Sequence, residues 1–197
     1  MATFSSQHLS ANRHDTHSTT TQGGSWSTKR IATLAILCAV ALVTSFIEIH
    51  IFPPAPWLSF DPSGIVVLVA GFAFGPGTGV LVAVLSWLVH LLFAFDPYGV
   101  LMAIISLVSL VAPASAIYWH KLNMRGAIIG MIVGSICSIV VCLLANLVIT
   151  PLYTPIAIRD VIAMILPILL PFNLLKVVLT SGITALIYKP ISKAIAG

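Results

Sequence analysis

Long apolar segments, separated by short polar or proline-rich connections, run through most of the chain. Apolar residues occupy nearly every position of these segments, without the strict alternation that is typical of a transmembrane β-barrel. An α-helix needs about 20 residues to cross the hydrocarbon core of a bilayer. The pattern therefore predicts an all-α integral membrane protein with six transmembrane helices, at about 31–47, 64–74, 80–95, 98–118, 126–149 and 168–188.

The composition agrees with this pattern. Of the 197 residues, 59% are hydrophobic and only 7% are charged, whereas soluble domains carry about 25% charged residues. A water-facing surface cannot be built from such a chain. Residues 1–28 differ in kind, because they are rich in Ser, Thr, His and Gly and lack apolar periodicity. We predict a disordered cytoplasmic tail over 1–28 and one six-helix membrane domain over 29–197.

The basic residues predict the orientation. If the N-terminus is cytoplasmic, seven of the nine Lys and Arg residues fall in inside segments. The positive-inside rule then places both termini in the cytoplasm. The acidic residues at positions 48, 61, 96 and 160 all fall at or near the outer side.

Two long connections are predicted on the outer side, at 48–63 and 150–167. Both contain several prolines and apolar residues. Such stiffened segments are plausible lids over a cavity. The alternative is plain anchoring at the membrane surface by Trp57 and Tyr153.

Lys176 stands in an otherwise apolar helix. A charge inside a membrane is costly and tends to face a bundle interior or a wet cavity. Asn173 lies three residues earlier, on the same helix face, and Asn146 is at a similar depth in another span. These groups predict a pocket for a polar, neutral or mildly acidic small molecule. The alternative is that Lys176 extends along its helix to the interface.

Other polar residues near the outer side are weaker candidates. His90 is more readily explained as a packed histidine than as a ligand contact, and Glu48 as an interface residue. Asp61 precedes the second span, where its carboxylate could either cap the helix or touch a ligand.

Small residues recur at helical spacing in two spans. Ala32, Ala35 and Ala39 lie on one side of the first span, where they would let another helix approach closely. Gly126, Gly130 and Gly134 in the fifth span are expected to pack helices within the protein.

Signatures of catalysis are lacking in the sequence. It contains no nucleophile elbow, no zinc-binding HExxH and no phosphate-binding loop. We therefore expect no enzyme activity, no metal, no cofactor and no nucleic-acid partner. Any ATP hydrolysis that drives transport must come from another chain.

Two stretches carry a resemblance to a known family. They read "FPPAPWLSFDPSGIVVLVAGFAFGPGTGVLVAVLSWLVHLLF" (52–93) and "ANLVITPLYTPIAIRDVIAMILPILLPFNLLK" (145–176). They resemble the substrate-binding S components of energy-coupling factor (ECF) vitamin transporters, and the riboflavin-specific members above all. The resemblance implies a vitamin held beneath the first and fifth loops in a bacterial cytoplasmic membrane. It also implies a transmembrane coupling subunit and two ATP-binding-cassette ATPases as partners.

The resemblance also implies roles for single residues. Polar contacts to riboflavin would come from the two amides and the lysine, and lid and ring contacts from residues 58–61 of the first loop. The implied substrate-binding set is Leu58, Ser59, Phe60, Asp61, Asn146, Tyr153, Asn173 and Lys176, and the implied coupling-subunit interface is Ala32, Ala35 and Ala39.

The chain departs from the riboflavin-specific pattern at three places. Gly64 stands where an acidic residue is expected, Ser86 and Trp87 replace a Lys-Asn pair, and 95–104 lacks a Gly-rich turn. The expected function is a high-affinity riboflavin-binding S component. The alternatives are an S component for folate, thiamine or pantothenate, a small self-sufficient carrier or channel, and a structural membrane adaptor.

Overall fold

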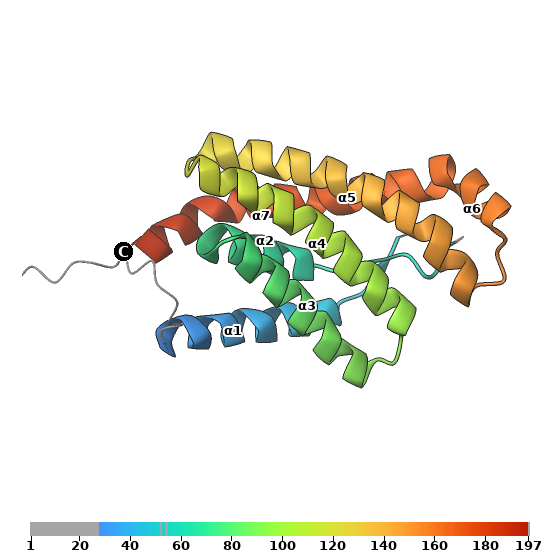
Figure 1. Cartoon of the computed structure of the whole chain (residues 1–197), viewed down its shortest axis with the longest axis horizontal. Helices are drawn as coiled ribbons and strands as arrows, with labels where there is room; N and C mark the ends of the chain where they lie inside the picture. The colour runs from blue at the N-terminus through green and yellow to red at the C-terminus, as the bar shows by residue number, and fades with distance from the viewer. Residues whose placement is uncertain (1–27, 52, 54, 197) are drawn as a thin grey trace, which may run out of the picture.

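The computed structural model describes residues 28–51, 53 and 55–196, apart from the side chains of residue 29 and of 188–196. The predicted polar tail lies outside this part of the chain, except for Thr28. Six long helices form one bundle (Figure 1), namely α1 (Thr28–Ser45), α2 (Ser63–Phe74), α3 (Pro76–Phe93), α4 (Pro97–His120), α5 (Met124–Tyr153) and α7 (Leu170–Ala196). The predicted helical fold class is confirmed, and each predicted span matches one of these helices to within a few residues, α7 excepted, which extends further toward the C-terminus.

Among the residues that the structure describes, four segments are long and apolar enough to cross a membrane: Pro76–Phe93, Pro97–His120, Met124–Tyr153 and Ile158–Ile187. The apolar stretches Arg30–Ser45 of α1 and Ser63–Phe74 of α2 are shorter. The 12 residues of α2 extend over only about 18 Å at 1.5 Å per residue. The count of six complete spans therefore stays a prediction.

Local sequence signals explain where the helices begin. The Asp96 carboxylate accepts a hydrogen bond from the Gly99 N–H at 2.9 Å, and Pro97 opens α4. The Asn123 side chain accepts from the Gly126 N–H at 2.7 Å, at the start of α5. Gly75 joins α2 to α3 with a φ of 103°, a backbone conformation that glycine adopts without a steric penalty.

The packing of α4 against α5 depends on two glycines. A Cβ atom at Gly130 would lie 2.3 Å from the Ala114 carbonyl oxygen, and one at Gly134 would lie 2.5 Å from the Leu110 carbonyl oxygen. The prediction that these glycines pack helices within the protein is confirmed. Gly126 differs, because a Cβ atom there would meet the Lys121 carbonyl oxygen of the preceding turn.

The segment 150–167 was expected to be a loop, and this expectation is wrong. Helix α5 continues to Tyr153, and after residues 154–157 the chain forms α6 (Ile158–Met164) and a π-helical stretch, η1 (Ile165–Leu169), that leads into α7. Pro151 lies inside α5 and Pro167 inside η1. Prolines in membrane helices are tolerated where local 3₁₀ or π adjustments satisfy the freed backbone groups, so they did not mark the ends of these helices.

The segment between α1 and α2 contains a short antiparallel hairpin that the sequence did not predict. Strands β1 (Ile49–His50) and β2 (Ser59–Phe60) pair with Ile49 opposite Phe60 and His50 opposite Ser59. The hairpin and α6 lie toward one end of the bundle, and the start of α1 and the end of α7 lie at the other (Figure 1).

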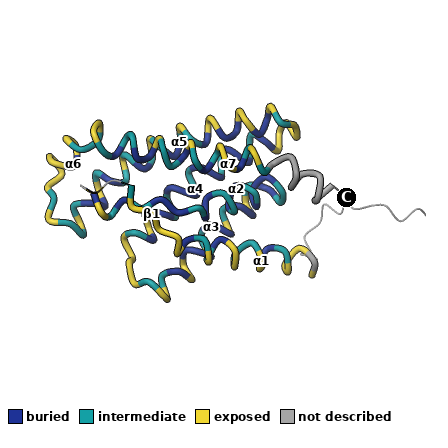
Figure 2. Tube along the Cα trace, turned by 180° about the vertical axis from the view of Figure 1, so that it is seen from behind, coloured by how far each residue is buried: buried dark blue, intermediate teal, exposed yellow. Residues whose placement is uncertain are grey.

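Burial divides each long helix into two faces. Buried residues turn toward the centre of the bundle, and exposed residues alternate with them along α5 (Figure 2). Many exposed residues are large and apolar, among them Leu144, Val148 and Leu152 of α5. Exposure of this apolar surface to water would be unfavourable, whereas its contact with the lipid chains of a bilayer is favourable.

Candidate functional site

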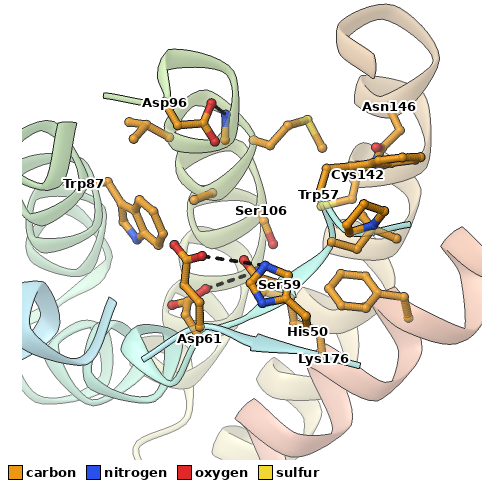
Figure 3. Close-up of a pocket in the computed structure, with 18 of the residues that line it drawn as sticks. His50, Trp57, Ser59, Asp61, Trp87, Asp96, Ser106, Cys142, Asn146 and Lys176 are labelled. Carbon is orange, nitrogen blue, oxygen red and sulfur yellow. Dashed lines mark hydrogen bonds and ion pairs between the residues drawn. The ribbon is translucent and has the colours of Figure 1, made fainter. Parts of the chain in front are cut away.

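A cavity of about 320 Å³ lies beneath the hairpin (Figure 3). Its walls come from the segment between α1 and α2 and from α3, α4, α5 and α7. Seven of the eight predicted substrate-binding residues line it: Leu58, Ser59, Asp61, Asn146, Tyr153, Asn173 and Lys176. Phe60 is the exception, because it is buried but is not part of the cavity wall. Successive side chains of a strand point to opposite faces, so Ser59 and Phe60 cannot both face the cavity.

The ammonium group of Lys176 pairs with a buried carboxylate. Lys176 Nζ lies 3.3 Å from Asp61 Oδ2, and the two side chains are 13% and 3% exposed. Extension of Lys176 to the membrane surface is therefore wrong. The ion-pair partner of this ammonium is Asp61, and not one of the two amides that were predicted to share its pocket. The two residues are 115 positions apart, and no local pattern connects them.

Asp61 also organises the start of α2. Its Oδ1 accepts a hydrogen bond from the Ser63 N–H at 3.1 Å and another from the Ser63 hydroxyl. The indole Nε1–H of Trp87 donates to the same hydroxyl at 3.3 Å. Asp61 thus binds the first backbone N–H of α2 from one residue ahead of the N-cap position, Pro62, and its other oxygen holds Lys176 in the cavity wall.

The two asparagines are fixed by their own helices. Asn146 Nδ2 donates to the Cys142 carbonyl at 2.8 Å, and Asn173 Nδ2 donates to the Leu169 carbonyl at 2.8 Å. The hydroxyl of Thr150, which the sequence did not single out, donates to Asn146 Oδ1 at 2.9 Å. Both amides are therefore oriented before any ligand arrives, which lowers the entropy cost of binding.

His90 is packed, as expected, and it also forms part of the wall. Its side chain is 3% exposed, and Nδ1 lies 2.7 Å from Ser45 Oγ. The imidazole stacks on Phe46 with the ring centroids 4.4 Å apart, and its centroid lies 4.7 Å from that of Trp87. His90 thereby joins α1 to α3 beside the cavity.

Two carboxylates lie in the exposed part of the wall. Glu48, expected to be an interface residue, lines the cavity with its side chain 40% exposed, and its Oε2 lies 3.9 Å from His50 Nε2. Asp96, the cap of α4, also lines the cavity and is exposed. The acidic residues predicted on the outer side thus gather at one end of the bundle.

Both aromatic residues that were considered as membrane anchors line the cavity. Tyr153 stacks on Tyr98 with the ring centroids 5.3 Å apart. Trp57 Nε1 is the one buried side-chain nitrogen or oxygen, among the residues that the structure describes, without a hydrogen-bond partner. An unsatisfied buried donor is costly, and an acceptor on a bound ligand would remove that cost.

The Trp57 donor is testable by a single substitution. In Trp57→Phe the aromatic surface remains and the N–H is removed. Losing one hydrogen bond to a ligand costs about 1.4 kcal/mol, or a tenfold weaker affinity. Isothermal titration of both proteins with riboflavin, the ligand expected from the resemblance, measures this difference. Equal affinities would show that the indole N–H has no part in binding.

A family model described as "ECF transporter, substrate-specific component" matches residues 29–188. The chain belongs to this family. The resemblance inferred from the two sequence stretches is confirmed, and the protein is a multi-pass membrane protein with helices that cross the bilayer. Membership implies a vitamin as ligand and the other subunits of an ECF transporter as partners.

Two similar proteins support the assignment. The chain is 31% identical to the solved structure of the S component of a bacterial ECF transporter, with a TM-score of 0.74 over 85% of this chain and 97% of that one. It is also 36% identical over 104 residues to the riboflavin transporter RibU of Staphylococcus aureus (strain TCH60). That alignment covers 52% of this chain and 55% of RibU, about half the length of each.

The structure shows where the residues of two of the three departures from the riboflavin-specific pattern lie in this S component. A Cβ atom at Gly64 would lie 3.0 Å from Thr180 Cγ2 and 3.1 Å from Leu107 Cδ2, so this position faces neighbouring helices rather than the cavity. Trp87 lines the cavity, whereas the Ser86 hydroxyl donates to the Val82 carbonyl of its own helix. The missing carboxylate at position 64 therefore removes no group from the cavity wall.

Proposed function

We propose that this S component captures riboflavin with high affinity at the outer face of a bacterial cytoplasmic membrane, for import by an ECF transporter. The main observation in support of the proposal is the cavity beneath the hairpin. Lys176, the pre-oriented amides of Asn146 and Asn173, and several aromatic side chains line it. The similarity to the riboflavin transporter RibU supports riboflavin as the vitamin.

The cavity wall suits the two parts of riboflavin. Trp57, Trp87 and Phe172 line the cavity and offer aromatic surface for the flat isoalloxazine ring. Asn146 and Asn173 offer amide groups at fixed positions to the ring edge and to the ribityl hydroxyls. A mostly apolar pocket with a few placed polar groups is the usual form of a small-molecule site.

We propose that the cavity opens to the cell exterior and that both termini are cytoplasmic. Arg30 is in the first turn of α1, while Lys121 and Arg125 flank the junction of α4 and α5. These elements start or meet at the end of the bundle that lies away from the hairpin (Figure 1). The positive-inside rule favours the cytoplasm for that end.

Import would depend on partners. The side chains of Ala32, Ala35 and Ala39 are exposed on α1, and we propose that a transmembrane coupling subunit packs against them. Two ATP-binding-cassette ATPases would supply the work for release of riboflavin to the cytoplasm.

Quenching of flavin fluorescence by the purified protein tests the proposed ligand. We expect riboflavin to bind with a dissociation constant in the nanomolar range, about −12 kcal/mol. Thiamine, folate and pantothenate, added in excess as competitors, should not displace it. Absence of riboflavin binding, or displacement by one of these vitamins at equal concentration, would refute riboflavin as the substrate.

Two α7 variants test whether riboflavin binds in the cavity. Asn173→Ala should weaken riboflavin binding by at least about tenfold, the equivalent of one lost hydrogen bond. Leu174→Ala is the matched control, because Leu174 is 52% exposed on the same helix and does not line the cavity. Equal losses in the two variants would contradict the assignment of the site.

A further inference from the structure

The side chains that line the cavity carry more negative than positive charge. Three carboxylates line it, those of Glu48, Asp61 and Asp96. Among the residues that the structure describes, Lys176 is the one Lys or Arg in the wall. With His50 and His90 neutral, the wall carries a formal excess of two negative charges. An anionic ligand would meet repulsion in this cavity.

The single ammonium group is already neutralised. Lys176 Nζ lies 3.3 Å from the Asp61 carboxylate, which is almost fully buried. A phosphate that approached Lys176 would therefore also approach Asp61, in surroundings where water screens charge poorly. The Asp61–Lys176 pair can donate and accept hydrogen bonds, but it supplies no net positive charge.

At the N-termini of α2 and α4, beside the cavity, a backbone N–H already has a hydrogen-bond partner in the protein. A helix N-terminus with free N–H groups is a ready anion site. At α2 the Ser63 N–H donates to Asp61, and at α4 the Gly99 N–H donates to Asp96. Both helices begin beside the cavity, and in both a carboxylate of the protein takes the position that a phosphate would take.

Two carboxylates that have no Lys or Arg partner among the described residues lie in the exposed part of the wall. They are Glu48 and Asp96, and in the part of the chain that the structure describes the ion-pair partner of Glu48 is the His50 imidazole, at 3.9 Å. Carboxylates at an entrance slow the approach of anions and raise their free energy in the bound state. The deep part of the cavity, by contrast, is neutral overall.

We propose that the cavity selects the uncharged form of its vitamin and rejects phosphorylated or otherwise anionic analogues, with Glu48 and Asp96 as the residues that determine this specificity. The inference rests on the proposed function and narrows it to unphosphorylated flavin. It also argues against the anionic vitamins folate and pantothenate.

Riboflavin and flavin mononucleotide form the decisive pair of ligands, because they differ only by the terminal phosphate. The measurement is fluorescence quenching at pH 8, where histidine is ordinarily neutral and the phosphate carries close to two negative charges. We expect flavin mononucleotide to bind at least about tenfold more weakly than riboflavin to the unmodified protein. The ratio of the two dissociation constants should fall as salt is added, because salt screens exposed charges.

Variants that remove the charges of Glu48 and Asp96 test whether these residues cause the preference for riboflavin over flavin mononucleotide. Glu48→Gln combined with Asp96→Asn should reduce the ratio of the two dissociation constants by about fivefold or more. Asparagine is an effective N-cap, so α4 should keep its start. Asp160→Asn is the matched control, because Asp160 is exposed on α6 and outside the cavity wall, and it should leave the ratio unchanged. If the double variant fails to fold, Glu48→Gln alone must still reduce the ratio.

Each result has a defined meaning. Equal affinities for the two flavins in the unmodified protein would overturn the inference and leave riboflavin as the proposed ligand. A ratio that is unchanged in the Glu48 and Asp96 variants would overturn the assignment to these residues. If neither flavin binds, the proposed function fails, and this inference fails with it.

Discussion

Replacing Lys176 with methionine is expected to remove riboflavin binding, with at least a hundredfold loss of affinity, and to destabilise the protein. The substitution keeps the volume of the side chain and removes its charge, so that Asp61 is left unpaired while 3% exposed. Breaking a buried ion pair by removing one partner costs about 3–5 kcal/mol. Flavin titration measures the first effect, and thermal unfolding in detergent measures the second.

A second substitution separates the two effects. In Asp61→Asn combined with Lys176→Met, the uncompensated carboxylate is gone, and the amide oxygen can still accept from the Ser63 N–H. We expect the double variant to recover most of the lost stability but not riboflavin binding. Recovery of both would mean that the ammonium group contributes to the fold alone, and recovery of neither would mean that the Asp61–Lys176 pair is not the cause of the destabilisation.

The Asp61–Lys176 pair also marks a limit of sequence reasoning. Both residues were identified, because a charge in an apolar helix and an acid ahead of a helix each call for an explanation. Their pairing was missed, since it depends on the position of α2 relative to α7, which no local pattern determines. The same holds for the bond between Ser45 and His90, which joins residues 45 positions apart.

The outer segments were harder to predict than the helices. Long apolar runs predict α3, α4 and α5 to within a few residues at each end, because few alternatives can satisfy the backbone in lipid. The segment 150–167 contains prolines, which argue for a loop in water but are compatible with helix in a membrane protein. The β1–β2 pairing comprises only two residues per strand, too few for a periodic signal.

The prediction that glycines of α5 pack helices within the protein was correct, and its physical basis is simple. Glycines four residues apart allow two helix backbones to approach closely, and the structure places Gly130 and Gly134 at such an approach. The exposed alanines of α1 follow the same pattern, but no helix in the described part of the chain covers them. The sequence alone cannot distinguish an internal contact of this kind from an external one.

Replacing Gly130 with alanine is expected to separate α4 from α5. The added Cβ atom would lie 2.3 Å from the Ala114 carbonyl oxygen, a backbone atom that cannot move without moving its helix. Overpacking of this kind costs about 1–3 kcal/mol. For a protein of this size, that cost lowers the melting temperature by roughly 2–12 °C, which thermal unfolding in detergent measures.

Gly182→Ala is the matched control for the packing of α4 against α5. Gly182 is also in a long helix, α7, and a Cβ atom there meets nothing within 4 Å. Alanine in a helix interior is favoured over glycine by about 0.5–1 kcal/mol, so this variant should be as stable as the unmodified protein or more stable. The two substitutions add the same methyl group, and only the neighbouring backbone differs between them. A melting temperature that falls equally in both variants would show that the loss at Gly130 does not arise from its contact with α4.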